Sequence, residues 1–183
     1  MTCSLVVNSK SGNTRMVSGA IKRALQAAGV EFVHAAALSD DADADQVALE
    51  AQGACAADMV LVGFWCDKGA CTPSVAALLS ALHGKRVFLF GTCGFGASQR
   101  YYQQIIDRVT SNLADDAELV GWAMCQGKMG PAVKQRYEAM LEQDPDNARA
   151  KLLLDNWAAA KDHPTKDDLD HMAVAAKKAV LGE

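Results

Sequence analysis

Short apolar runs alternate with longer amphipathic stretches along the first two thirds of the chain. The apolar runs predict five β-strands, at residues 3–8, 30–38, 58–64, 85–92 and 118–125. Between them, apolar residues that recur on one helical face predict helices at residues 13–28, 46–53, 72–83 and 98–113. Strands that alternate with helices in this way predict a parallel sheet with helices on both faces.

The last third of the chain contains no predicted strand. Three helical pieces are expected there, at residues 132–142, 147–161 and 166–180. A five-stranded doubly wound sheet needs only one helix after its last strand, so we interpret residues of about 130–162 as a helical insertion. The helix at about 166–180 is then expected to cover the sheet. The insertion has an apolar stripe that should be buried, on the domain or on a partner: Ala148, Leu152, Leu153 and Trp157.

These elements predict one domain over residues 1–183, of the α/β class. The expected architecture is a three-layer αβα, doubly wound, five-stranded parallel sheet with extra C-terminal helices. In such sheets, ligands bind at the carboxyl ends of the strands, where the strand order reverses. The candidate site is therefore sought in the loops that follow the strands.

The loop after the first strand has the composition of a phosphate site. It reads Ser9-Lys10-Ser11-Gly12-Asn13-Thr14 and leads directly into the first helix. Several backbone N–H groups and the helix N-terminus would converge on one point, and three hydroxyls and Lys10 could add donors. The alternative is an ordinary strand-to-helix turn. The loop contains neither the Walker pattern GxxxxGK[ST] nor GxGxxG.

Residues 9–14 match the [ST]-x-[ST]-G-x-T phosphate loop of flavodoxins at every position, and they lie after the first strand, as in that family. The chain resembles the flavodoxin family over about residues 3–127, and in its last helix. The resemblance implies the strand order 2-1-3-4-5. It also implies an FMN cofactor whose 5′-phosphate lies on residues 9–14.

Two further loops are expected to hold the flavin ring. The third strand leads into Phe64, Trp65, Cys66, Asp67, Lys68 and Gly69. By resemblance to flavodoxins, Trp65 is assigned to the ring; the alternative is a Trp packed on its own loop, and Phe64 is also a candidate core residue. The fourth strand ends in Thr92, Cys93, Gly94, Phe95 and Gly96. Its glycines allow the backbone to approach a planar ring.

The loop after the fourth strand departs from the flavodoxin pattern. It lacks the usual Asp, and the nearest tyrosines, Tyr101 and Tyr102, lie further on in the predicted helix. Phe95 is therefore the expected substitute for the stacking Tyr. After the fifth strand, Lys128 is interpreted either as part of the cofactor rim or as a solvated lysine.

Composition and charge exclude some classes of function for this protein. The chain has 18 basic and 22 acidic residues and a net charge of −4, which argues against a nucleic-acid partner. No apolar run approaches the roughly 18 residues of a membrane span, and signal-peptide features are missing. We therefore expect a cytoplasmic protein without a membrane partner.

The six cysteines form no CxxC pair and are expected to be reduced thiols. No metal site is predicted, because the cysteines and the four histidines show no ligand spacing. No catalytic residue is assigned either. Two functions remain open: an FMN-binding electron-transfer protein that serves a partner enzyme, or an FMN-dependent oxidoreductase of the quinone reductase type with its own small substrate.

Overall fold

The computed structural model describes residues 1–96 and 98–182; residues 97 and 183 of the expected domain lie outside that part. Five parallel strands form one sheet in the order β2-β1-β3-β4-β5, which confirms the predicted class and order. The strands are β1 (Thr2–Asn8), β2 (Glu31–Leu38), β3 (Met59–Trp65), β4 (Arg86–Cys93) and β5 (Glu118–Gln126). Each begins and ends within two residues of its predicted bounds.

Helices follow the strands as the amphipathic pattern predicts. They are α1 (Asn13–Ala27), α2 (Ala44–Ala54), α3 (Pro73–Ser80), α4 (Gln99–Thr110), α5 (Pro131–Gln143), α6 (Ala148–Ala160) and α7 (Lys166–Leu181). Local signals fix their ends. Pro73 is the first residue of α3, and Thr165 with Asp168 forms the capping box of α7.

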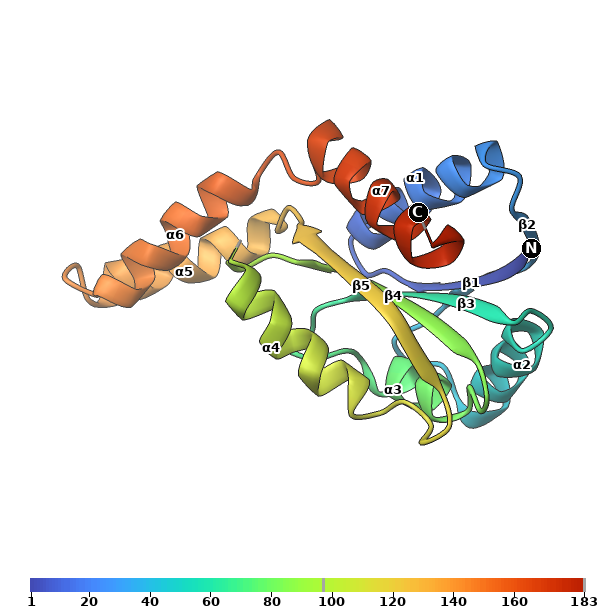
Figure 1. Ribbon diagram of the computed structural model, residues 1–183. Coiled ribbons are helices and arrows are strands. Elements are labelled where there is room, and N and C mark those ends of the chain that lie inside the picture. Colours follow the sequence, from blue (N-terminus) through green and yellow to red (C-terminus); the bar gives the residue numbers. More distant parts are fainter. Residues whose placement is uncertain (97, 183) are drawn as a thin grey trace.

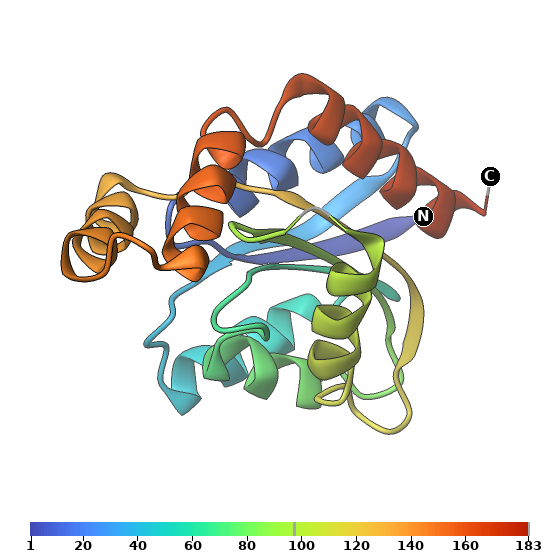
Figure 2. The same cartoon turned by 90° about the vertical axis from the view of Figure 1, so that its left-hand side faces the viewer.

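The sheet lies between two helical layers (Figures 1 and 2). Helices α1 and α7 pack side by side on one face, and α2, α3 and α4 cover the other. Alternate strand residues supply the two cores: Val60 and Val62 point to the α2–α4 side, whereas Met59 and Leu61 point to the α1–α7 side. Burial on both faces explains the continuously apolar strands.

Two glycine–phenylalanine pairs fill the space near the carboxyl ends of β3 and β4. Gly63 lies opposite Phe90, and Phe64 lies opposite Gly91. A Cβ atom on Gly63 would lie 2.3 Å from the Phe90 ring, and one on Gly91 would lie 2.7 Å from the Phe64 ring. Each ring therefore occupies the space above a glycine, one on each face of the sheet.

A Gly63→Ala variant is expected to lower the free energy of unfolding by about 1–3 kcal/mol, because the new methyl group overpacks against Phe90. Urea denaturation would measure the change. The matched control is Gly19→Ala, inside α1, where the Cβ atom meets only the flexible Arg23 side chain. That variant should be stabilised by about 0.5–1 kcal/mol through helix propensity. Equal stabilities of the two variants would contradict this packing account.

The C-terminal tail contains one helix that covers the sheet and two that pair with each other. Helix α7 buries Met172, Ala176 and Val180 against β5 and α1. Helices α5 and α6 pair with each other and form a hairpin that projects from the end of the molecule where β5 terminates (Figure 1). We call residues 131–160 the hairpin.

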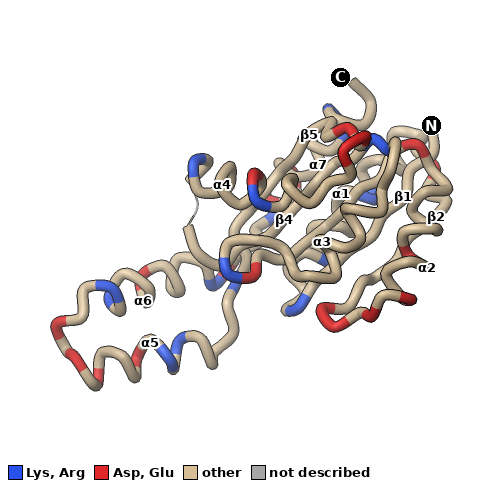
Figure 3. The backbone as a smooth tube through the Cα atoms, turned by 90° about the horizontal axis from the view of Figure 1, so that it is seen from below, with Lys and Arg blue, Asp and Glu red and all other residues tan. Residues whose placement is uncertain are grey.

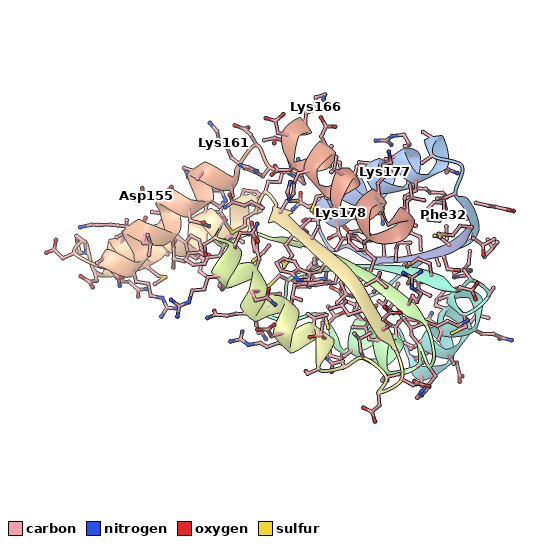
Figure 4. All side chains as sticks on the ribbon, viewed as in Figure 1. Phe32, Asp155, Lys161, Lys166, Lys177 and Lys178 are labelled. Carbon is pink, nitrogen blue, oxygen red and sulfur yellow. The ribbon has the colours of Figure 1, made fainter. Side chains whose placement is uncertain are left out.

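The expected apolar stripe on α6 is only partly buried within the domain, where Leu153 and Trp157 are half-buried. Ala148 and Leu152 are exposed, and the buried residues of α6 are Ala150 and Ala160. A single partner helix, α5, covers only a narrow face of α6, and burial of the rest of the stripe on a partner stays a prediction. Asp155 and Lys161 lie on the outer side, away from the sheet (Figure 4). Both charge signs occur along the hairpin (Figure 3).

Candidate functional site at the carboxyl ends of the strands

A cavity of about 550 Å³ opens at the carboxyl ends of β1, β3, β4 and β5, a volume typical of a cofactor or small-ligand site. The loops after all four strands contribute to its wall, as does the first turn of α5 through Val133. The predicted loops thus meet at one place. The hairpin flanks this place, as expected for an insertion that leaves β5 at the ligand-bearing edge.

The loop of residues 9–14 turns sharply into α1. Gly12 is the N-cap residue and has φ +88°, a conformation that glycine adopts without steric cost. Within the described part of the chain, the backbone N–H groups of residues 11–14 have no hydrogen-bond acceptor. The Arg15 N–H donates to Ser9 Oγ at 3.2 Å. The result is a group of free donors at the positive end of a helix dipole.

Asn13 ties this loop to the loop after β5. Its Nδ2 donates to Ser11 Oγ at 3.0 Å and to the Lys128 carbonyl at 2.9 Å. Its Oδ1 is buried and lacks a partner among the described residues. An unpaired buried oxygen is costly unless a ligand donates to it, so this atom is an acceptor available to a ligand hydroxyl.

The Thr14 hydroxyl joins the start of α1 to the sheet. It is fully buried and hydrogen-bonds the Thr92 hydroxyl at 2.9 Å, which joins the start of α1 to the end of β4. A hydroxyl that accepts from Thr92 can still donate to a phosphate, so the expected role of Thr14 stays a prediction, and its backbone N–H is free.

Trp65 lies at the boundary between the cavity and the β1 loop. Its indole Nε1 donates to Asp40 Oδ1 at 2.8 Å, and the Lys10 ammonium lies 4.7 Å from its ring centroid. These contacts fix the ring orientation and add a cation–π interaction. The half-buried indole still lines the cavity, so a flat ligand there would contact it.

The β4 loop is held by a side chain from the hairpin. Asn156 Nδ2 donates to the Gly94 carbonyl at 2.9 Å, and Asn156 Oδ1 accepts from the Gly96 N–H at 3.1 Å. The same Oδ1 accepts from Gln126 Nε2 at 3.3 Å. The Asn156 amide therefore pairs with backbone groups on both sides of Phe95 in the β4 loop. These bonds connect the hairpin to the site.

Phe95 and Tyr101 form the outer rim beside this loop. Their rings meet edge to face with centroids 6.1 Å apart, and Phe95 is 38% exposed. Tyr101 lies in α4, as the sequence predicts, but its side chain returns to the cavity wall. Burial raises the pKa of Tyr101 to about 12, so its hydroxyl stays protonated at neutral pH.

Most of the predicted site residues meet at the cavity. Those that line it are Lys10, Ser11, Asn13, Trp65, Cys66, Lys68, Gly69, Thr92, Cys93, Gly94 and Phe95. Ser9, Gly12, Thr14, Asp67 and Gly96 belong to the same loops without lining it. Phe64 is a correction, because its side chain is fully buried in the core against Gly91.

Several lining residues were not predicted from the sequence. Apart from Lys128, which the sequence marked as a rim candidate, they are Tyr101, Arg108, Gly127, Met129, Gly130 and Val133. Four of the lining side chains, those of Lys10, Lys68, Arg108 and Lys128, are cationic, and no lining residue of the described chain is acidic. The cavity therefore favours an anionic ligand.

Comparison with known proteins identifies the family. A family model described as a flavodoxin domain matches residues 4–177. The chain belongs to the flavodoxin family. A curated relative from Clostridium symbiosum, flavodoxin-like domain-containing protein BilS, is 35% identical over 100% of this chain and 100% of its own. The protein of that name from Clostridioides difficile is 32% identical over 68% of this chain and 70% of its own.

Flavodoxin 1 from Bacillus cereus has the same fold, with a TM-score of 0.53 at 13% identity, over 100% of this chain and 99% of that structure. Membership of this family supports a flavin cofactor and a role in electron transfer. Among the described helices, none is long and apolar enough to cross a membrane.

Proposed function

We propose that this flavodoxin binds FMN and passes electrons to a partner protein in the cytoplasm. The observation that carries the proposal is the group of free N–H donors in residues 11–14, at the start of α1 and beside a cavity of about 550 Å³. A phosphate dianion pairs well with such donors and with the helix dipole. The cationic lining supports the same anionic ligand.

The residues present fit FMN. The backbone of residues 11–14 and the Ser11 hydroxyl would hold the 5′-phosphate, and Asn13 Oδ1 would accept from a ribityl hydroxyl. Trp65 and Phe95 would contact the ring, while the Gly94 backbone lies free of a Cβ atom beside it. Bound FMN supplies one- or two-electron transfer; the chain binds, orients and shields it.

The partner is expected to present an acidic face. Lys68, Arg108 and Lys128 are exposed residues that line the cavity, and no lining residue in the described chain is acidic. Opposite charges steer association. Mixing the reduced, FMN-loaded protein with candidate acceptors would test the carrier role. Reoxidation by an acceptor protein, with none by NAD(P)⁺ or a quinone, is the expected result.

A second candidate function is an FMN-dependent oxidoreductase with its own small substrate, such as a quinone. The observation that favours it is the apolar wall added by Met129 and Val133 at the base of the hairpin. An enzyme that binds its own substrate needs a more enclosed pocket than an electron carrier does. Multiple turnover of NAD(P)H with a quinone, by the FMN-loaded protein alone, would establish this alternative and overturn the carrier proposal.

Removing the Asn156 side chain should weaken FMN binding about tenfold. Asn156→Ala deletes the bonds to Gly94 and Gly96, and neutral hydrogen bonds contribute about 0.5–1.5 kcal/mol each. Without these bonds the β4 loop is less ordered in the free protein, and ordering it on binding lowers the affinity for FMN. The dissociation constant would be measured by quenching of flavin fluorescence.

The matched control is Asn147→Ala, in the same hairpin. Asn147 caps α6 by accepting from the Ala150 N–H at 2.9 Å, so its loss should lower helix stability and leave FMN affinity unchanged. If both variants weaken FMN equally, the hairpin acts through its overall stability and Asn156 does not hold the loop.

A further inference from the structure

Two cysteines from different strands lie next to each other in the cavity wall. Strands β3 and β4 are parallel and pair Trp65 with Thr92, and the Cys66 N–H continues the ladder by donating to the Thr92 carbonyl at 2.9 Å. The next residues in register are Cys66 and Cys93. Both line the cavity, and Cys66 packs against the core cluster that contains the buried Cys93.

We propose that Cys66 and Cys93 form a thiol–disulfide couple that, in the FMN-free chain, exchanges electrons with small disulfides that enter this cavity. The inference goes beyond FMN binding and does not depend on it. Neighbouring strands are about 4.7–4.9 Å apart, and disulfides join Cα atoms about 4.4–6.8 Å apart. The backbone spacing therefore allows the bond.

The two sulfurs have different roles. Interaction with Cys66, and further interactions with the Phe95 backbone and the Tyr101 hydroxyl, lower the pKa of Cys93 to about 7 in spite of its burial. The same pairing with Cys93, and then burial, raises the pKa of Cys66. Cys93 is thus the thiolate that attacks, and Cys66 the thiol that resolves.

The exchange balances in two steps. The Cys93 thiolate attacks one sulfur of a small disulfide, whose sulfur–sulfur bond breaks and releases one thiolate. The Cys66 sulfur, on losing its proton, then attacks Cys93 in the mixed disulfide and releases the second thiolate. Two electrons pass to the small disulfide, which becomes two thiols and takes up the two protons that the cysteines lose.

Cys71 is the competing partner. Asp67 and Ala70 exchange both backbone hydrogen bonds at 2.9 Å, so Cys66 and Cys71 flank the same tight turn. Burial raises the pKa of Cys71 to about 11, which keeps it a thiol, and it does not line the cavity. We therefore assign Cys93, and not Cys71, as the disulfide partner of Cys66.

The test uses the full, reduced, FMN-free chain in a Cys55→Ser background, incubated with oxidised glutathione. Trypsin cleaves after Lys68, Lys85 and Arg86, so Cys66, Cys71 and Cys93 fall in three different peptides. Mass spectrometry should find the Cys66 and Cys93 peptides joined, with the loss of two hydrogens. Cys66→Ser should trap glutathione on Cys93, and Cys71→Ser should leave the joined peptides unchanged.

The initial rate of reaction should rise about tenfold from pH 6 to pH 8, because the thiolate fraction of a group with a pKa of about 7 rises by that factor. Joined Cys66 and Cys71 peptides, the absence of a disulfide, or a rate that rises only above pH 8 would overturn the proposal. FMN affinity, measured separately by fluorescence, decides the proposed function independently of this result.

Discussion

A Gly12→Asp variant is expected to lose FMN affinity by at least about 100-fold while the domain stays folded. The new carboxylate would stand among the N–H donors of residues 11–14 and face the phosphate dianion. A charged hydrogen bond lost and a like charge gained together cost about 3 kcal/mol or more. No atom lies within 4 Å of a Cβ atom at Gly12, so the substitution does not clash with the core.

The matched control for this variant is Gly29→Asp. Gly29 has φ +84°, close to the +88° of Gly12, and also has open space around it. It follows α1 at the opposite end of the helix, so it carries the same backbone strain without a nearby phosphate. Circular dichroism should show both variants folded, and flavin fluorescence should show that only Gly12→Asp fails to bind. Normal binding by Gly12→Asp would refute the phosphate assignment.

The second large effect is expected at Trp65. Trp65→Ala should weaken FMN by about 1–3 kcal/mol, taking the scale of a base stacked on an aromatic side chain. It should also raise the flavin reduction potential, because a stacked electron-rich ring disfavours the reduced anion. Calorimetric titration and a potentiometric titration would measure the two changes.

Trp65→Phe separates stacking from hydrogen bonding. It keeps an aromatic ring and removes only the bond from Nε1 to Asp40, so it should retain most of the affinity. Phe95→Ala provides a second comparison, because Phe95 is the other ring at the rim. If Trp65→Ala changes neither affinity nor potential, the flavin ring lies elsewhere in the cavity.

The strands and helices were predictable because local pattern determines them. Runs such as residues 59–64 are buried on both faces, so their apolar character is continuous. The loop of residues 9–14 was predictable for a related reason: the free donors belong to one contiguous turn whose geometry depends on Gly12.

The remaining features depend on contacts between distant segments. Asn156 reaches the β4 loop only because the hairpin folds back over the strand ends, and no local signal distinguishes it from other helical asparagines. Cys66 and Cys93 are neighbours through the register of β3 and β4, which a search for closely spaced cysteines does not detect. Phe64 was included in the candidate site because it leads into the β3 loop, although its ring lies in the core above Gly91.

The most direct test of the account is a titration of the FMN-free protein with FMN and, in parallel, with riboflavin, which lacks the phosphate. The account predicts one FMN per chain, with quenched flavin fluorescence. Riboflavin should bind at least about 100-fold more weakly, because it leaves the donors of residues 11–14 unpaired. Equal affinities for the two flavins, or no binding of FMN, would contradict the central claim that the start of α1 holds the cofactor phosphate.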